Sequence, residues 1–394
     1  MIELSKFMVY NINSMNYALV KFFHFSLFLT IISSNVKAQV RIEINPSSED
    51  EKCNVIFLVG DGMGLSQLSS AYFYGKKEPN FSRFPIVGLS KTKSGSHKIT
   101  DSAAGATAFS TGKKTYNGAI GVDMDSNAVL TITEELAIND WSIGFISTSS
   151  ITHATPASFY SHVPSRIMQE EIAKDLVYSE VDFFAGGGYS WFINRADSVN
   201  YLDTLIHKGF FLDTNSVFTP ADNNQAKLGY LLAAEGLQPK HLGRDNFLTD
   251  ATNRGIEFLD AKEEPFFLMI EGSQIDWGGH ANIGEYVIQE VLDFDLAVGA
   301  ALDYANRHGN TLVVVTADHE TGGFTMAGEQ SIGPFMSINR DYNALLPSFS
   351  TGGHSCSMVP VLAAGPHAEK FSGIYENTNI YSIFKEITLR RSSN

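Results

Sequence analysis

Residues 55–64 read VIFLVGDGMG, a short apolar run that ends in glycine and acidic residues. The same pattern of an apolar run with a polar or glycine-rich end occurs at residues 143–146, 181–185, 266–270 and 312–315. Continuous apolar runs of about four to eight residues are typical of strands that are buried on both faces of a parallel sheet. The sequence therefore predicts a parallel sheet whose strands come from the whole length of the chain.

Helical patterns separate these runs. Residues 285–308 carry apolar side chains at regular helical spacing and precede Gly309, which predicts a helix that ends at the glycine. This helix would join two strands as the crossover of a right-handed βαβ unit. The sequence thus predicts an α/β fold with a large, mostly parallel central sheet and helices on both faces.

Composition and charge narrow the class of protein. The chain has 394 residues, with 28 Lys and Arg against 43 Asp and Glu, and a formal net charge of −15. Hydrophobic residues make up 44%, which is too many for a disordered chain. The acidic balance, without a basic run, argues against a nucleic-acid partner. An anionic substrate would need local positive charge to bind here.

The N-terminus has the features of a targeting segment. Lys21 precedes 11 largely apolar residues at 22–32, and the small residues of Val36-Lys37-Ala38 follow. The run is shorter than the ~20 residues needed to span a bilayer, so we expect a signal peptide over 1–38 that is cleaved after Ala38. The mature protein would be periplasmic or secreted, with no stable membrane insertion.

The mature chain, 39–394, is expected to form a single catalytic domain. Residues 189–264 and 321–351 have weaker patterns, and we expect them to form peripheral insertions. Cys53 and Cys356 are the only cysteines. We expect them to stay unpaired, because about 330 residues of core can fold without a disulfide.

Acidic and imidazole side chains gather where the predicted strands end. Ligands of open α/β sheets bind beyond the carboxyl ends of the strands. Histidines mixed with carboxylates suit Zn²⁺, and carboxylates with a hydroxyl suit Mg²⁺. Several such sets at successive strand ends suggest a cluster of more than one metal. The candidate ligands are Asp61, His153, Thr155, Glu271, Asp276, His280, Asp318, His319 and His354.

A candidate nucleophile lies at a predicted helix start. Residues 100–108 read TDSAAGATA, with Asp101 or Ser102 near the N-cap and small residues behind it. A phosphate at such a position meets free N–H groups and the positive end of the helix dipole. The common alternatives lack support, because the chain has no P-loop, no G-x-S-x-G elbow and no complete dinucleotide fingerprint.

With these motifs in view, the sequence resembles the alkaline phosphatase family over roughly residues 54–385. The resemblance rests on six stretches in the family's order: VGDGMG (59–64), TDSAAGATAFSTGKKTYNGAIGVD (100–123), THATPASFYSHVPSR (152–166), EGSQIDWGGHAN (271–282), TADHETGGF (316–324) and TGGHS (351–355). It implies a phosphate monoesterase with broad substrate range, suited to phosphate scavenging, with two Zn²⁺ and one Mg²⁺ per subunit.

The resemblance also implies roles for individual residues. Ser102 matches the nucleophile that becomes phosphoserine, and Arg166 matches the guanidinium that grips the phosphate, a task for which a bidentate fork is suited. The implied ligand sets are Asp276, His280 and His354 for one zinc, Asp318, His319 and Asp61 for the other, and Asp61, Thr155 and Glu271 for magnesium.

Three departures from the family's pattern bear on function. His153 lies next to the magnesium site, where some members carry Asp and others His, so it would either let the third site take Zn²⁺ or Co²⁺ in part or support the site and substrate without binding the metal. Trp277 stands where others have Lys or His, so we expect phosphate to be held less tightly. Only 34 residues separate His319 from His354, which reduces any crown-like insertion at the interface of the homodimer that the family implies.

Alternatives within the superfamily remain. A sulfatase needs Cys or Ser in a C/S-x-P-x-R setting, whereas Ser102 is followed by Ala-Ala-Gly. A phosphodiesterase usually has Thr as nucleophile and lacks the magnesium site. A cytosolic mutase would not need a signal peptide. An inactive metal- or phosphate-binding protein would typically have lost a ligand or the nucleophile. The sequence therefore favours the monoesterase.

Overall fold

A computed structural model describes residues 53–217, 225–332, 334 and 338–389. The predicted signal peptide at 1–38 lies outside these residues. The strands are β1 Asn54–Gly60, β2 Ile86–Lys91, β3 Ser142–Ser150, β4 Phe183–Gly187, β5 Phe210–Asp213, β6 Lys227–Leu231, β7 Phe266–Gly272, β8 Thr311–Thr316, β9 Glu320–Thr321, β10 Thr325–Ile332, β11 Ile338–Ser348, β12 His354–Ser355, β13 Val359–Ala364 and β14 Gly373–Glu376.

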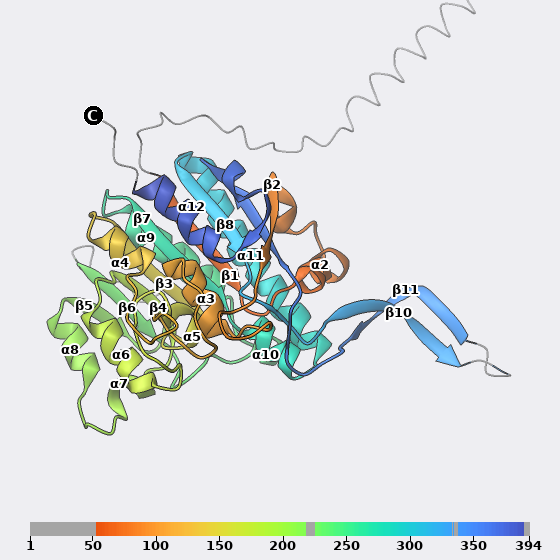
Figure 1. Cartoon of the computed structure of the whole chain (residues 1–394), viewed down its shortest axis with the longest axis horizontal. Helices are drawn as coiled ribbons and strands as arrows, with labels where there is room; N and C mark the ends of the chain where they lie inside the picture. The colour runs from red at the N-terminus through yellow and green to blue at the C-terminus, as the bar shows by residue number, and fades with distance from the viewer. Residues whose placement is uncertain (1–52, 218–224, 333, 335–337, 390–394) are drawn as a thin grey trace, which may run out of the picture. The chain divides into compact units, whose positions relative to one another are not determined.

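Along the chain the helices come between the strands, and Figure 1 shows them packed around the sheet. They are α2 Leu65–Tyr74, α3 Ser102–Thr111, α4 Ile132–Ala137, α5 Ala154–Ala157, α6 Gln169–Tyr178, α7 Ser190–Ile193, α8 Tyr201–His207, α9 Phe247–Asp260, α10 Gln274–His280, α11 Gly284–His308 and α12 Thr378–Thr388. Three short 3₁₀ helices are also described: η1 Asn80–Arg83, η2 Lys240–Leu242 and η4 Ala368–Phe371.

The described residues contain a ten-stranded sheet in the order β14-β2-β13-β8-β1-β7-β3-β4-β6-β5. Its strands pair in parallel except at β13, which runs antiparallel to both β8 and β2. Strands β1, β7 and β8 are buried along almost their whole length, as expected for central strands covered on both faces. The predicted α/β fold with a mostly parallel sheet is confirmed.

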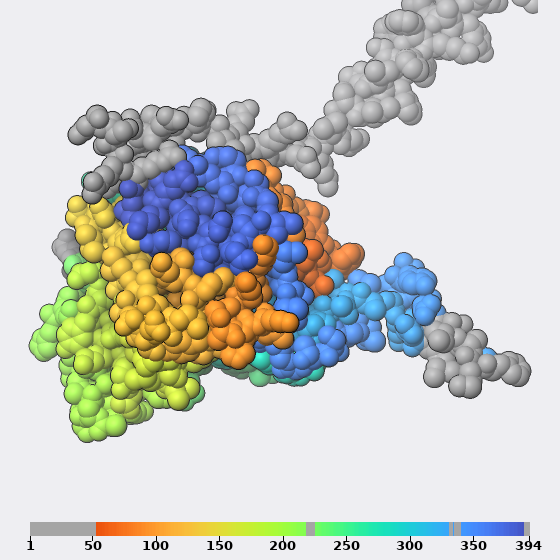
Figure 2. Space-filling view, in the orientation of Figure 1, coloured from red at the N-terminus to blue at the C-terminus, as the bar shows by residue number. Residues whose placement is uncertain are grey.

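Helices cover both faces of the sheet (Figure 1). On one face α11 packs on β8 and β1, and α9 packs on β3 and β7. On the other face α12 packs against α3 and α4, and Figure 2 shows these segments side by side in blue, orange and yellow. The Phe384 ring of α12 contacts the rings of Phe57 and Phe267 at 5.2 and 5.5 Å between centroids. The main core lies between these helices and the sheet.

Local signals explain where the helices begin and end. Helix α11 ends where it was predicted to, because Gly309 takes up a left-handed backbone with φ of 72°. The capping box of α4 is present, since the Thr131 and Glu134 side chains each bond the other's backbone N–H. Helix α3 begins at Ser102, and its N-cap is Asp101. Each of these ends follows from a short sequence motif.

The two segments with weak sequence patterns take different forms. Residues 189–264 include β5 and β6, which pair with each other and extend the central sheet beyond β4. Residues 321–351 hold the antiparallel hairpin of β10 and β11, which extends away from the sheet in Figure 1. Cys53 is buried and Cys356 is exposed, and both are free thiols, as expected.

Candidate functional site

Four neighbouring strands bring the candidate ligands together. In the sheet the order is β8, β1, β7, β3, and the chain leaves the carboxyl end of each strand into a segment that carries ligands. Because the pairing is parallel, these four ends meet at one edge of the sheet. Residues far apart in the sequence therefore line one site.

A first cluster joins Asp276, His280 and His354. Asp276 and His280 lie one turn apart on α10, and His354 comes from β12. The two Nε2 atoms are 3.0 Å apart, and the Asp276 Oδ1 lies 3.4 and 3.5 Å from those of His280 and His354. Three donor atoms therefore converge on one point.

The hydrogen bonds of the two Nδ1 atoms determine whether the Nε2 atoms, which face the cluster, can bind a metal. The Nδ1 atoms of His280 and His354 each lie 2.8 Å from a backbone carbonyl oxygen, of Gly352 and Thr100 respectively. In the neutral rings each Nδ1 therefore carries the hydrogen, and each Nε2 presents a lone pair. Two lone pairs at this distance beside a carboxylate repel one another unless a cation lies between them, and this donor set suits Zn²⁺.

A second cluster joins Asp61, Asp318 and His319, all fully buried. The His319 Nε2 lies 3.2 Å from Asp318 Oδ2 and 3.5 Å from Asp61 Oδ1. Burial pushes the pKa of His319 well below its ordinary value, so the ring is neutral. Its Nδ1 faces the Thr321 hydroxyl at 3.1 Å, and that hydroxyl donates to Asp276. The Nε2 lone pair of His319 thus faces carboxylates, which again fits a bound cation.

A third cluster joins Asp61, His153 and Glu271. Neither carboxylate oxygen of Asp61 accepts a hydrogen bond among the described residues, and the same holds for Oε1 of Glu271. Burial and the nearby charges of Asp318 and Asp276 raise the pKa of Asp61 well above its ordinary value. Thr155 on α5 interacts with Glu271 and opposes the rise that burial causes in the pKa of that carboxyl.

These unsatisfied buried oxygens are a further test of whether the site fits metal ions. Buried carboxylates in mutual repulsion are costly unless they are paired with positive charge. The oxygen-rich third cluster fits Mg²⁺, and His153 beside it adds a nitrogen donor. Asp61 belongs to both the second and the third cluster, so it is placed to bridge two ions.

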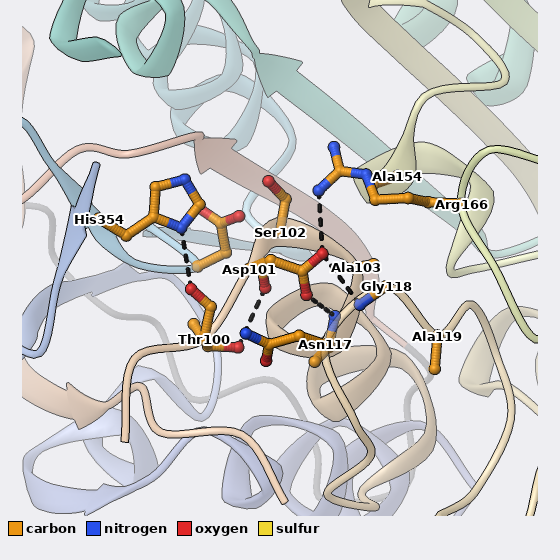
Figure 3. A network of polar contacts seen from close by, with 12 residues as sticks. Thr100, Asp101, Ser102, Ala103, Asn117, Gly118, Ala119, Ala154, Arg166 and His354 are labelled. Carbon is orange, nitrogen blue, oxygen red and sulfur yellow. Dashed lines mark hydrogen bonds and ion pairs between the residues drawn. The ribbon is translucent and has the colours of Figure 1, made fainter. Parts of the chain in front are cut away.

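Ser102 occupies the start of α3 at the same edge (Figure 3). It is 2% exposed, and its Oγ lies 3.3 Å from Nε2 of His319. Small residues let this helix approach closely, because a Cβ on Gly105 would lie 3.0 Å from the Cβ of Asp318. The hydroxyl therefore lies beside the second cluster.

Arg166 is held in place by two neighbours. Its Nη1 donates to Asp101 Oδ2 at 3.1 Å, as Figure 3 shows, and its Nη2 lies 3.3 Å from Nε2 of His153. Burial, and then the charge of Arg166, lower the pKa of His153 to about 3. A neutral imidazole has one N–H, so His153 either accepts from Arg166 through Nε2 or offers Nδ1 to a metal with Nε2 protonated.

Asp101 is a site residue that the sequence indicated only as a helix cap. Its Oδ1 accepts from the Ala104 N–H at 3.1 Å, which caps α3. Its Oδ2 accepts from Arg166 and from the Gly118 N–H at 3.0 Å. The only local signal is its position next to Ser102, because its partners lie 17 and 65 residues away.

Trp277 forms an apolar wall of the site. Its ring lies edge-on to His153 with 6.1 Å between centroids. On its other side lies Gly236, where an added Cβ would come within 2.6 Å of the indole Cη2. Segment 189–264, expected to be peripheral, thus reaches the site. Each candidate site residue thus lies next to at least one other, and together these contacts form one connected site.

Comparison with known proteins agrees with this geometry. The sequence model of the alkaline phosphatase family matches residues 52–348. Alkaline phosphatase 3 of Bacillus subtilis (strain 168) is 33% identical, over 91% of this chain and 94% of its own. Alkaline phosphatase of Escherichia coli (strain K12) is 30% identical, over 84% and 85% of the two chains.

Solved structures of alkaline phosphatases are also similar to this chain. The alkaline phosphatase of the Antarctic bacterium TAB5 is 49% identical over 86% of this chain and 99% of its own, with a TM-score of 0.82. A histidine variant of that enzyme has Mg bound in a site called M3. This chain belongs to the alkaline phosphatase family of metal-dependent phosphoric monoester hydrolases.

Proposed function

We propose that this enzyme hydrolyses phosphate monoesters through a phosphoserine on Ser102, with two zinc ions and one magnesium ion per subunit. The observation that carries the proposal is the position of the Ser102 hydroxyl, 3.3 Å from His319 and at the start of α3, beside clusters of metal-ligand type in which His319 also groups with Asp276 and His354. The proposed zinc ligands are Asp276, His280 and His354 for one ion and Asp61, Asp318 and His319 for the other. Those of magnesium are Asp61, Thr155 and Glu271, with His153 beside them.

The bound metals would supply Lewis-acid chemistry, which lowers the pKa of the serine hydroxyl and of a water and stabilises the leaving oxygen. No histidine base beside Ser102 is then required. The Ser102 Oγ attacks phosphorus, the bond from phosphorus to the leaving oxygen breaks, and the released alcohol takes a proton. Water then attacks the phosphoserine, which releases inorganic phosphate and restores the hydroxyl.

The chain's own groups hold the phosphoryl group during both steps. Arg166 is proposed to bind two non-bridging oxygens with its two Nη atoms, a match of geometry that lysine lacks. The N-terminus of α3 adds the positive end of a ten-residue helix. These contacts stop at the phosphate, which supports a broad substrate range and a role in phosphate scavenging. Trp277 and His153 would form the wall that faces the rest of the substrate.

The test compares a phosphate monoester, a phosphate diester and a sulfate ester with purified residues 39–394 at alkaline pH. We expect monoester turnover to dominate, to disappear on chelation and to return only with both Zn²⁺ and Mg²⁺. Ser102→Ala should abolish turnover. Ser179→Ala is the matched control, because the hydroxyl of this serine at the end of α6 donates to the Leu176 carbonyl, away from the site and from the proposed dimer surface.

Other outcomes of this assay would contradict the assignment as a phosphate monoesterase. Preferred hydrolysis of the diester or the sulfate would make it a phosphodiesterase or a sulfatase. No turnover in any metal mixture would indicate an inactive metal- or phosphate-binding protein. Monoesters with small and large leaving groups, run side by side, measure the substrate range, and a spread of more than ~100-fold in kcat/KM would contradict broad recognition.

A homodimer is part of the proposal, supported by an exposed apolar surface. The side chains of Leu65, Phe73, Val87 and Ile374 on α2, β2 and β14 are 57, 63, 60 and 60% exposed. Leu65, Val87 and Ile374 line a cavity of about 690 Å³. Beside it the hairpin is tied to α2, since the Tyr74 hydroxyl donates to the Leu345 carbonyl at 3.0 Å. A second copy of this chain would cover the surface.

Light scattering after gel filtration tests the dimer. Phe73→Asp combined with Val87→Asp should give monomers, whereas Ile138→Asp should leave the dimer intact, because it changes a side chain that directly follows α4 and is 73% exposed. A wild-type monomer would contradict the proposal.

Export through a signal peptide at 1–38, to the periplasm or beyond, is proposed from the sequence. No helix in the described part of the chain is long and apolar enough to cross a membrane. The N-terminal sequence of the exported protein should begin at Gln39. Retention of residues 1–38 would contradict cleavage. We also propose that residues 39–394 act as one catalytic domain.

A further inference from the structure

The two oxygens of the Glu271 carboxylate have opposite surroundings. Glu271 is fully buried. Its Oε2 accepts hydrogen bonds from the hydroxyls of Ser147 and Ser273, both at 2.6 Å, and a longer one of 3.4 Å from Ser149. Its Oε1 accepts none among the described residues. One oxygen is thus saturated by the protein while the other is left bare beside Asp61 and His153.

The sheet and a helix start place these hydroxyls. Ser147 lies on β3 directly beside Glu271 on β7 in the parallel register. Ser273 follows Glu271 by two residues and is the N-cap residue of α10. Neither placement depends on a long or mobile side chain, because a serine hydroxyl is only two bonds from the backbone.

The direction of these hydrogen bonds follows from the carboxylate, whose oxygens only accept. The Oγ atoms of Ser147 and Ser273 lie 2.8 Å apart, and each can direct its single hydrogen to Oε2 of Glu271. The N–H of Ser149 donates to both Oγ atoms, at 3.0 and 3.1 Å, and helps to hold them in place. Each hydrogen bond to a buried carboxylate is charge-assisted and therefore stronger than a neutral one.

We propose that Ser147 and Ser273 are positioning residues that make Glu271 a one-oxygen ligand of the magnesium site, by holding Oε2 and leaving Oε1 for the ion. This inference rests on the magnesium site of the proposed function. Mg²⁺ demands near-ideal octahedral geometry, whereas Ca²⁺ accepts a carboxylate through both oxygens. The two serines therefore favour Mg²⁺ over Ca²⁺.

The experiment measures Mg²⁺ and Ca²⁺ binding to zinc-loaded enzyme by equilibrium dialysis with elemental analysis. Ser147→Ala and Ser273→Ala should each weaken Mg²⁺ binding at least ~10-fold, as is usual for partners that orient a ligand. The double variant should lose more and should discriminate less between Mg²⁺ and Ca²⁺. Zinc content should stay at the wild-type value.

Two controls separate positioning from packing. Ser142→Ala removes a hydroxyl from the same strand that bonds the Glu264 carboxylate at 2.5 Å, at the opposite end of β3, and should leave Mg²⁺ binding unchanged. Ser147→Cys keeps the volume with a weak donor and should match Ser147→Ala. If the cysteine variant keeps wild-type affinity, the effect is packing and the proposal falls.

Failure of this inference can be told from failure of the proposed function. Wild-type Mg²⁺ affinity in both alanine variants, with monoester turnover intact, would overturn the positioning role alone. A wild-type enzyme that takes up zinc but no Mg²⁺ would overturn both the magnesium site and the role of the serines.

Discussion

At the scale of single residues, Asp101 shows how one carboxylate serves two purposes. Its Oδ1 caps α3 through the Ala104 N–H, and its Oδ2 holds Arg166 and the Gly118 N–H. The helix that presents Ser102 and the guanidinium proposed to bind phosphate are thereby fixed to one side chain. The relative placement of the proposed nucleophile and of the guanidinium proposed to bind phosphate depends on this residue.

Asp101→Asn should separate these two roles. The amide oxygen can keep the cap of α3, whereas the amide nitrogen can accept neither from Arg166 nor from the Gly118 N–H. Loss of one charge-assisted contact, about 1.5–3 kcal/mol, should leave Arg166 free to turn and should raise KM for a monoester roughly tenfold or more. Steady-state kinetics measure this change. Thermal unfolding is the control and should show only the cost of the lost acceptor for the Gly118 N–H, about 1 kcal/mol. An unchanged KM would show that His153 alone fixes Arg166.

The ligands at the strand ends could be predicted from the sequence, because finding the end of a strand needs only the residues of that strand. Asp61, Glu271 and Asp318 each lie within or directly after an apolar run, so a single strand assignment places them. The second role of Asp101 and the serines around Glu271 could not be predicted, because they depend on the register between distant segments. A serine within a strand looks the same whether it faces a ligand or a neighbouring helix.

At the scale of elements, the turn after β6 determines how α10 presents its side chains. The Gln274 amide donates to the carbonyls of Thr148 and Leu237 at 2.9 and 2.8 Å, and its oxygen accepts from the Tyr286 hydroxyl at 2.7 Å. Gly236, next to this connection, lies against the indole of Trp277. Helix α10 is therefore joined to the turn by a hydrogen bond to Leu237 and by the packing of Trp277 on Gly236.

Gly236→Ala should displace Trp277. The added Cβ would lie 2.6 Å from the ring, and such overpacking typically costs about 1–3 kcal/mol. We expect KM for monoesters to rise several-fold and kcat to change less, because Ser102 and its neighbours are untouched. In a Trp277→Ala background the same substitution should have almost no effect on KM. Equal effects in both backgrounds would show that Gly236 acts on something other than the indole.

A second contact between elements predicts a pH dependence of stability. The His162 Nε2 lies 2.8 Å from Glu134 of α4, and its Nδ1 lies 2.7 Å from the Gly121 carbonyl oxygen. Burial alone would lower the pKa of His162, but these hydrogen bonds and the charges of Glu134 and Asp175 raise it. Burial alone would raise the pKa of Glu134, but its hydrogen bonds to His162 and Thr131 lower it.

Because the folded pKa of His162 exceeds the unfolded value of about 6.5, its contribution is full below that pH and is lost as pH rises through the folded value. Glu134, with its pKa lowered from 4.5, contributes fully above that pH and loses its contribution as pH falls through the folded value. His162→Gln should thus cost about 1 kcal/mol of unfolding free energy at pH 5.5 and much less at pH 9. Urea unfolding in the presence of chelator measures both, and a cost that grows with pH would contradict this pair.

Strands could be predicted from the sequence where burial on both faces requires a continuous run of apolar residues. The apolar runs identify β1, β3, β4, β7 and β8, which are buried on both faces and so carry no polar alternation. The short strands β5 and β14 lie at the edges of the sheet and are partly exposed, so their sequences lack such a run. For the same reason the segment 189–264 reads as peripheral although it extends the sheet.

At the scale of the whole molecule, the fold assembles negative charge in its interior. Three adjacent parallel strands, β8, β1 and β7, deliver Asp318, Asp61, Glu271 and Asp276 to one edge, where all four are buried. The backbone pairing that stabilises the sheet therefore brings like charges together at its carboxyl edge. Bound cations would compensate these charges, so we expect metal binding and folding to be coupled.

Metal removal should therefore lower the melting temperature substantially. At ion concentrations near 1,000 times Kd, each bound ion contributes about 4 kcal/mol, which corresponds to several degrees for a chain of this size. We expect chelator to lower the melting temperature by ~10 °C or more, and Zn²⁺ with Mg²⁺ to restore it. Scanning calorimetry of the loaded and chelated protein measures the difference.

Asp61→Asn gives this prediction its sharpest form. Asp61 accepts no hydrogen bond among the described residues and faces the carboxylates of two clusters. Replacing it with a neutral side chain of the same shape removes repulsion when no metal is bound, but it removes a shared ligand when metals are present. The variant should therefore melt above the wild type in chelator and below it with Zn²⁺ and Mg²⁺. A variant that melts lower than the wild type in both conditions would mean that Asp61 stabilises the fold by itself, and that the sheet edge does not depend on bound cations.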